Sequence, residues 1–154
     1  MRVLVRRRLT IDEIMQKIRA YREKYGSIDA VRSRAYSEGI KSKIWDIYAE
    51  WYALQSAYQS YEEDGEFFYV VEEEISPDIA RRILSPKMVE LVRQIAIGVD
   101  SISDLARKLG RSVSNVYKDL KFLADIGIVE LYPIGRRKKP YLLAEEIVVE
   151  FLSP

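Results

Sequence analysis

One stretch of this chain constrains its fold more than any other: GRSVSNVYKDLKFLADIGIVEL, residues 110–131. It opens with glycine, arginine and serine, continues with a helical pattern, and closes with a second glycine and a short apolar run. Ser112 is a typical helix N-cap residue. The apolar residues at Val113, Val116, Leu120 and Leu123 recur at the three- and four-residue steps of one helix face. The stretch predicts a helix of about 14 residues that ends at Gly127.

A second capped helix precedes it. Ser101 is followed three residues later by Asp104, and an acid in the first turn favours the positive end of the helix dipole. The buried face of this helix is expected to consist of Ile102, Leu105, Ala106 and Leu109. Two helices joined by a short turn containing glycine are typical of a helix-turn-helix, whose second helix enters a DNA major groove.

If Val116 points into the core, the opposite side of the second helix carries polar and basic residues. Steps of about 100° per residue place these side chains outward. We therefore predict DNA contact by Ser114, Asn115, Tyr117, Lys118 and Lys121, with Arg111 and Ser112 positioning the DNA backbone at the helix start.

A basic hairpin is expected directly after this helix. The apolar runs IVELYPI and KPYLL flank a turn over residues 135–139 that contains Arg136, Arg137, Lys138 and Lys139. Such a turn is typical of the wing of a winged helix, which runs beside the duplex. Between Leu105 and Lys139 nine basic residues stand against three acids, a local net charge of +6. This concentration favours contact with phosphate.

The same residues also allow other interpretations. An outward polar stripe is often only a solvated helix face, and some winged helices bind proteins. The agreement of the capped turn, the preceding helix and the basic hairpin favours DNA. Arg6, Arg7 and Arg8 lack such a context and are interpreted as a solvated strand edge.

Composition narrows the function further. The chain has 154 residues, no cysteine and no histidine, with 25 basic and 24 acidic residues. Disulfides, Cys/His zinc sites and histidine-dependent triads are excluded, and no Gly-rich phosphate loop occurs. We expect that the protein is not an enzyme and that it binds neither a cofactor nor a metal. Neither an apolar leader core nor a run long enough to span a membrane is present, which predicts a cytoplasmic protein.

The N-terminal half is expected to be helical with short strands. Thr10 opens a helix that ends at Gly26, and a weaker helix is expected over residues 29–38. A helix of about 20 residues follows, with apolar residues at helical spacing from Ile44 to Tyr61. The aromatic and apolar surface of this helix is larger than one small helical bundle usually buries. We therefore predict that this surface forms a core, a dimer interface or a partner interface. The residues assigned to a partner or dimer interface are Trp45, Tyr48, Trp51, Tyr52, Tyr58 and Phe122.

Strands are expected at three places. Residues 2–8 (RVLVRRR) and 145–151 (EEIVVEF) alternate in polarity and could pair with each other, or serve in dimerisation together with or instead of the aromatic helix. A further strand is predicted over residues 67–71, inside an acidic segment from Tyr61 to Glu74. Those acids are expected to be solvated, although they could also neutralise a basic partner or the chain's own basic helix.

The segments SPKMVELVRQIA, SISDLARKLGRSVSNVYKDLKFLADIGIVEL and GRRKKPY resemble the winged helix-turn-helix of MarR/ArsR-type transcriptional regulators. The resemblance is closest to small archaeal regulators, which end in a strand similar to EEIVVEF, and it covers about 70 residues. It implies a homodimer that binds a pseudo-palindromic operator in double-stranded DNA. Phe122 departs from the pattern, because such helices usually carry a polar residue there. This departure predicts that Phe122 packs on the N-terminal half.

The segment MQKIRAYREKYG and the aromatic helix after it resemble parts of small prokaryotic proteins encoded beside toxins. This gives an alternative function: an antitoxin-like protein that binds a small partner protein and represses its own operon. The sequence thus predicts a mainly α protein with small β elements (α+β). A helical region over residues 1–84 would precede a winged helix-turn-helix domain over residues 85–154.

Overall fold

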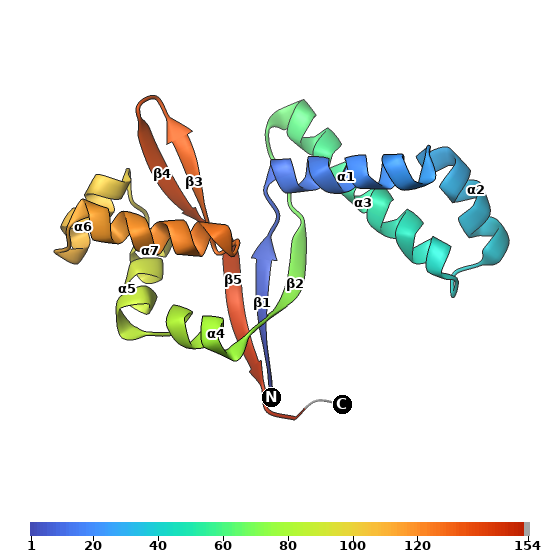
Figure 1. Cartoon of the computed structure of the whole chain (residues 1–154). Coiled ribbons are helices and arrows are strands. Elements are labelled where there is room, and N and C mark those ends of the chain that lie inside the picture. Colours follow the sequence, from blue (N-terminus) through green and yellow to red (C-terminus); the bar gives the residue numbers. More distant parts are fainter. Residues whose placement is uncertain (153–154) are drawn as a thin grey trace. The chain divides into compact units, whose positions relative to one another are not determined.

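A computed structural model describes residues 1–152 of the protein and confirms the α+β class. Over these residues the chain forms seven helices and five strands, and the strands make two small antiparallel sheets (Figure 1). The chain divides into two compact units. Unit 1 comprises Met1–Arg8 and the chain from Val70 onward, and unit 2 comprises Leu9–Tyr69.

Unit 1 contains a three-stranded sheet with the N-terminal strand at its centre. The strand order is β2-β1-β5, where β1 is Arg2–Arg8, β2 is Val70–Ile75 and β5 is Ala144–Glu150. Val3 faces Ile75 on one side and Val149 on the other. The expected pairing between the first and last strands is therefore confirmed. Val3, Leu4 and Val5 are all buried, as expected for the middle strand of a sheet.

Two sequence predictions about this sheet were wrong. Arg6, Arg7 and Arg8 do not form a solvated strand edge, because β1 has a neighbour on each side. The strand predicted over residues 67–71 begins instead at Val70 and continues through the three glutamates to Ile75. The reason is charge pairing across the sheet: Arg7 binds Glu73 on β2, whereas Arg6 and Arg8 reach carboxylates on β5.

The rest of unit 1 is a helical core closed by a hairpin. The apolar faces of its helices meet around Leu91, Leu105, Leu120 and Leu123, all of which have no measurable exposure. Val5 from the central strand joins the same core. The elements are α4 Pro77–Ile83, α5 Pro86–Ile97, α6 Ile102–Leu109, α7 Val113–Asp125, β3 Val129–Ile134 and β4 Arg137–Leu142.

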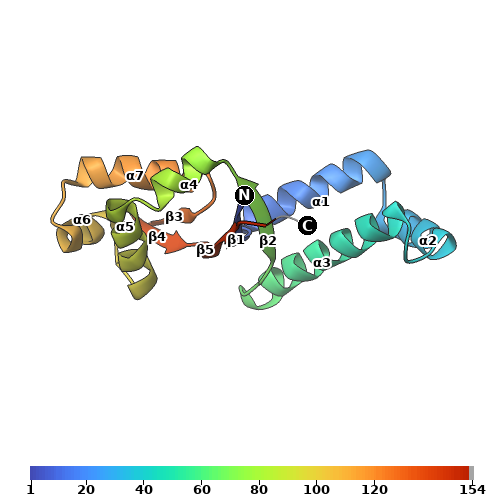
Figure 2. The same ribbon diagram turned by 90° about the horizontal axis from the view of Figure 1, so that it is seen from below.

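Unit 2 consists of three helices, α1 Ile11–Tyr25, α2 Ile28–Glu38 and α3 Lys43–Asp64. Thr10 and Glu13 form the expected capping box at the start of α1. α3 packs against both other helices (Figure 2). Trp51, near the centre of α3, is fully buried. The Trp51 ring stacks on Tyr21 of α1 with ring centroids 5.5 Å apart. Burial, followed by the charge of Glu50, raises the pKa of Tyr21 to about 12.

The two units do not divide at the boundary between residues 84 and 85 that the sequence predicts. Strand β1 belongs to unit 1 because it pairs with β5 and β2, and β2 and α4 belong there too. Ile75 and Ile79 pack against the core of unit 1, which explains why these elements lie with the C-terminal part.

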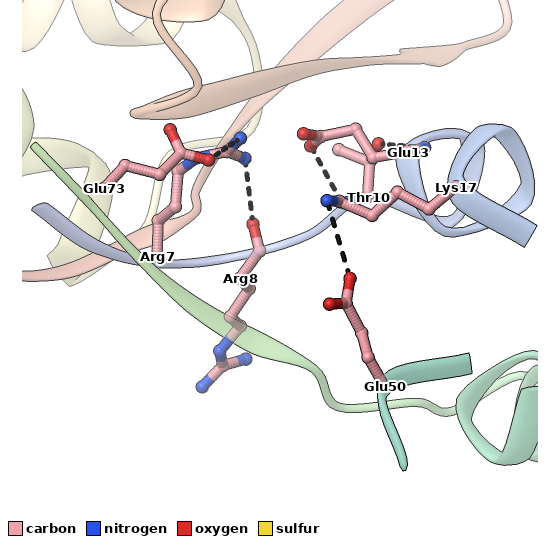
Figure 3. Close-up of polar contacts among 7 residues, drawn as sticks. All are labelled: Arg7, Arg8, Thr10, Glu13, Lys17, Glu50 and Glu73. Carbon is pink, nitrogen blue, oxygen red and sulfur yellow. Dashed lines mark hydrogen bonds and ion pairs between the residues drawn. The ribbon is translucent and has the colours of Figure 1, made fainter. Parts of the chain in front are cut away.

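The C-terminal end of α7 rests on a buried arginine. Arg7 is only 7% exposed, and its Nη2 donates to Glu73 at 2.9 Å while its Nη1 donates to the Arg8 carbonyl at 3.4 Å (Figure 3). Gly127, with φ of 78°, lies just beyond α7. A Cβ at this position would lie 2.8 Å from the Arg7 Cζ. Only glycine therefore fits here without displacing the guanidinium, whose charge is also favourable near a helix C-terminus.

Candidate nucleic-acid interface

The turn between α6 and α7 has the predicted caps. The Ser101 hydroxyl accepts from the Asp104 N–H, and the Ser112 hydroxyl accepts from the Asn115 N–H at 3.3 Å. Gly110 ends α6 in the left-handed conformation, with φ of 64°. The Asp100 backbone N–H, followed by Arg107, lowers the pKa of Asp104 to about 2. Asp104 therefore stays ionised and keeps the start of α6 fixed at physiological pH.

The side of α7 opposite the core is exposed and carries the predicted residues. Val116, Leu120 and Leu123 have no measurable exposure, so the orientation of the helix is fixed. Lys121 forms an exposed pair with Asp125 at 3.7 Å, whereas Lys118 has no carboxylate partner among residues 1–152. The exposed residues of α7 at this side are Ser114, Asn115, Tyr117, Lys118 and Lys121, and Ser112 at the cap is exposed as well.

Val113 corrects the sequence analysis. It was expected in the buried face, but it is 48% exposed. As the first residue of α7 it precedes the part of the helix that the core covers. The spacing to Tyr117 is four residues, so both lie on one helix face. An apolar residue therefore belongs to the outward surface, and this spacing was the signal that the sequence analysis missed.

Arg111 lies in a different setting from the one predicted. Its Nη2 donates to Asp119 at 2.6 Å, and Lys87 on α5 lies 3.6 Å from the same carboxylate. Asp119 is 6% exposed, so the group is largely internal. Arg111 thus ties the turn to α7. The buried Asp119 carboxylate is thus paired with two cations.

The hairpin after α7 is tighter than expected. Its turn is Gly135 and Arg136, and Arg137, Lys138 and Lys139 are on β4 rather than in the loop. Gly135 has φ of 60° and no other residue of the turn has positive φ, which is the pattern of a type II′ turn. Arg136, Arg137 and Lys138 are exposed and have no carboxylate partner within residues 1–152. Lys139 is half-buried, with its Nζ 5.1 Å from the Tyr141 ring centroid.

The predicted interface residues of α3 separate into two groups. Trp45, Tyr48 and Tyr52 form one aromatic cluster with Tyr36 of α2, with neighbouring ring centroids 5.3–6.2 Å apart. Tyr36 is 65% exposed and was missed because α2 is only weakly amphipathic. Trp51, in contrast, is a core residue and cannot contact a partner. Tyr58 is half-buried beside α1.

Phe122 is partly buried and contacts a residue of the predicted N-terminal region over residues 1–84, as the sequence predicts. It packs against the core of unit 1, and the Arg82 guanidinium of α4 lies 3.6 Å from its ring centroid. A cation over an aromatic face at this distance is an attractive contact. The aromatic residue therefore holds α4 onto α7 within unit 1.

One family model matches the C-terminal part of the chain. The model of the family designated HVO_A0114 matches residues 83–149, which run from the end of α4 to the last residues of β5. The chain is therefore similar to that family over the part of unit 1 that contains α5, α6, α7, β3 and β4 and most of β5. No curated protein and no solved structure matches the chain.

Neither a metal centre nor a membrane span is found in the described part of the chain. Within residues 1–152 no three acidic side chains converge as metal ligands. In the same range no helix has both the length and the apolar character needed to cross a bilayer.

Proposed function

We propose that the protein is a cytoplasmic transcriptional regulator that binds double-stranded DNA sequence-specifically as a homodimer and has no enzymatic activity. The observation that carries the proposal is the distribution of unpaired cations. Lys118 on α7, and Arg136, Arg137 and Lys138 on the hairpin, are exposed without carboxylate partners in the described chain. Most other arginines of this nearly neutral protein are in ion pairs. Unpaired cations are the residues available to phosphate.

The proposed mechanism assigns a role to each part of this surface. The outward side of α7 enters the major groove, where Ser114 and Asn115 can hydrogen-bond to base edges. Val113 and Tyr117 offer apolar contact to thymine methyl groups at the start of the same face. Lys118 and Lys121 bind phosphate, and the hairpin acts as a wing along the backbone. Arg111 acts indirectly, because its bond to Asp119 fixes the turn that presents Ser112.

A double substitution on α7 tests the orientation. We expect Lys118→Ala/Lys121→Ala to weaken binding to DNA from upstream of the gene, and to lower the salt slope by about 0.9 for each lost phosphate contact. The measurement is fluorescence anisotropy over about 50 to 300 mM salt, against scrambled DNA. Lys41→Ala/Lys43→Ala, which removes the same charge from exposed positions of unit 2, is the control. Equal binding by both variants would mean that α7 does not face DNA.

A second function is favoured by the aromatic cluster of unit 2. Tyr36 and Tyr52 are 65% and 54% exposed, and aromatic residues of this kind are enriched at protein interfaces. If the protein is antitoxin-like, its aromatic cluster would bind the protein encoded by a neighbouring gene. In that case, we expect Tyr36→Glu/Tyr52→Glu to abolish co-purification of the co-expressed neighbour product without changing DNA affinity. If the neighbour product still co-purified with this variant, the aromatic cluster would not be a partner interface and the antitoxin-like function would be contradicted.

A further inference from the structure

Unit 2 contains a cavity of about 320 Å³ between α1 and α3, lined in part by cations. This volume corresponds to about ten water molecules and lies at the lower end for small-molecule sites. α1 contributes Met15, Ile18, Arg19 and Arg22, and α3 contributes Gln55, Tyr58 and Gln59.

The two arginines of the cavity have no anionic partner. The guanidinium groups of Arg19 and Arg22 form no ion pair and no hydrogen bond with another residue of the described chain. Elsewhere on α1, Lys17 lies 3.9 Å from Glu50, and Lys24 lies over the Tyr25 ring. In the described chain, the arginines without a carboxylate are these two, Arg82 on Phe122, and the wing residues Arg136 and Arg137.

The arginines also lie close to each other. They are three residues apart on one helix, which places their side chains on the same face, where like charges repel. A bound anion would remove this repulsion and accept two guanidinium hydrogen bonds at once, a geometry that suits carboxylate and phosphate groups. The α1 side of the cavity therefore carries two positive charges, and no carboxylate forms an ion pair with either of them.

The other walls restrict the ligand further. The hydroxyl of Tyr58 interacts with Glu62, which raises the pKa of Tyr58, and Gln59 Nε2 donates to Glu63 at 2.9 Å. Both polar groups are thus held by acids at the α3 side of the cavity. These acids disfavour a second anionic group there. Met15 and Ile18 supply an apolar wall instead. A ligand that matches the cavity has one anionic head and an apolar body.

We propose that this cavity binds a small organic anion, with a carboxylate or phosphate head on Arg19 and Arg22 and an apolar body against Met15 and Ile18. The proposal concerns unit 2 alone and does not depend on DNA binding. Both tryptophans of the chain, Trp45 and Trp51, are on α3, so their fluorescence reports binding within the same unit.

Phenyl phosphate and benzoate are the probes, titrated into the full chain while tryptophan fluorescence is followed. We expect saturable binding of at least one of them with Kd of about 1 mM or below. Inorganic phosphate, which lacks the apolar body, is expected to bind at least about tenfold more weakly. Absence of a saturable response to both aromatic probes overturns the proposal.

Substitution of the arginines locates the site. We expect Arg19→Gln/Arg22→Gln to weaken binding by at least about tenfold, since both charge-assisted contacts are lost. Lys24→Gln/Arg34→Gln is the matched control, because it removes the same charge from unit 2 away from the cavity lining. Thermal melts followed by circular dichroism confirm that both variants are folded. Equal loss of binding in both variants would indicate unspecific charge attraction and would also overturn the proposal.

Discussion

Replacing Arg136, Arg137 and Lys138 together with glutamine is expected to lower DNA affinity by roughly 10- to 150-fold at moderate salt. Each exposed cation that binds a phosphate contributes about 0.5–1 kcal/mol, so three contribute about 1.5–3 kcal/mol. None of the three has a carboxylate partner within residues 1–152, so no ion pair in the protein opposes their contact with phosphate. The salt slope should fall by about 2.7, since each phosphate contact contributes about 0.9.

The same anisotropy titration checks this expectation. Arg81→Gln/Arg93→Gln/Lys41→Gln removes the same net charge at other exposed positions, and Arg81 and Arg93 are already paired with acids. This control should retain most of the affinity. If the control loses as much as the wing variant, net charge alone governs binding and the hairpin is not a wing. The folded state should be unaffected, because the substituted side chains are exposed.

Replacing Trp51 with alanine is expected to destabilise unit 2 by about 3–5 kcal/mol, the usual cost of deleting a large aromatic side chain from a core. Trp51 has no measurable exposure and is the largest fully buried side chain in the described chain. Its loss leaves a cavity and removes the stacking on Tyr21. Stabilities of marginal domains are of similar size, so unit 2 would be largely unfolded or close to it.

Urea unfolding followed by the fluorescence of the remaining Trp45 measures this effect. Tyr52→Ala is the matched control on the next residue of α3. Tyr52 is 54% exposed, so its removal should cost no more than about 1 kcal/mol. A similar cost for the two variants would contradict the core assignment of Trp51. Binding of DNA by unit 1 in the Trp51 variant would show whether the reading surface depends on an intact unit 2.

Local patterns predicted the helices well. Val116, Leu120 and Leu123 are all fully buried as their spacing indicates, and the serine caps at Ser101 and Ser112 lie where the sequence placed them. Such patterns depend on residues within a few turns of each other. The pairing of the first and last strands could also be inferred, because each is a short apolar run flanked by charges, basic in the first strand and acidic in the last.

Contacts between distant residues were not predictable in the same way. The strand through Glu73 was mistaken for a solvated acidic segment, since its partner Arg7 is far away in the sequence. Trp51 and Tyr52 are adjacent aromatic residues, and only the packing against Tyr21 decides which of them is buried. For the candidate interface, the sequence identified the exposed polar residues of α7. It did not reveal that Asp119 would bind Arg111, because the helical pattern does not show how the turn before α7 orients the Arg111 side chain.

The entry and exit of unit 2 lie at neighbouring positions in the fold. Arg8 faces Val70 across the β1–β2 ladder, and one residue further the Leu9 N–H donates to the Tyr69 carbonyl at 2.9 Å. Topologically, residues 9–69 thus occupy the place of a hairpin loop in the sheet of unit 1. An insertion at such a position disturbs the pairing of β1 with β2 little, because the two ends of the inserted segment lie next to each other. The segment between β1 and β2 can therefore be replaced by a shorter, longer or unrelated one without breaking the pairing of these two strands, provided that its ends stay adjacent.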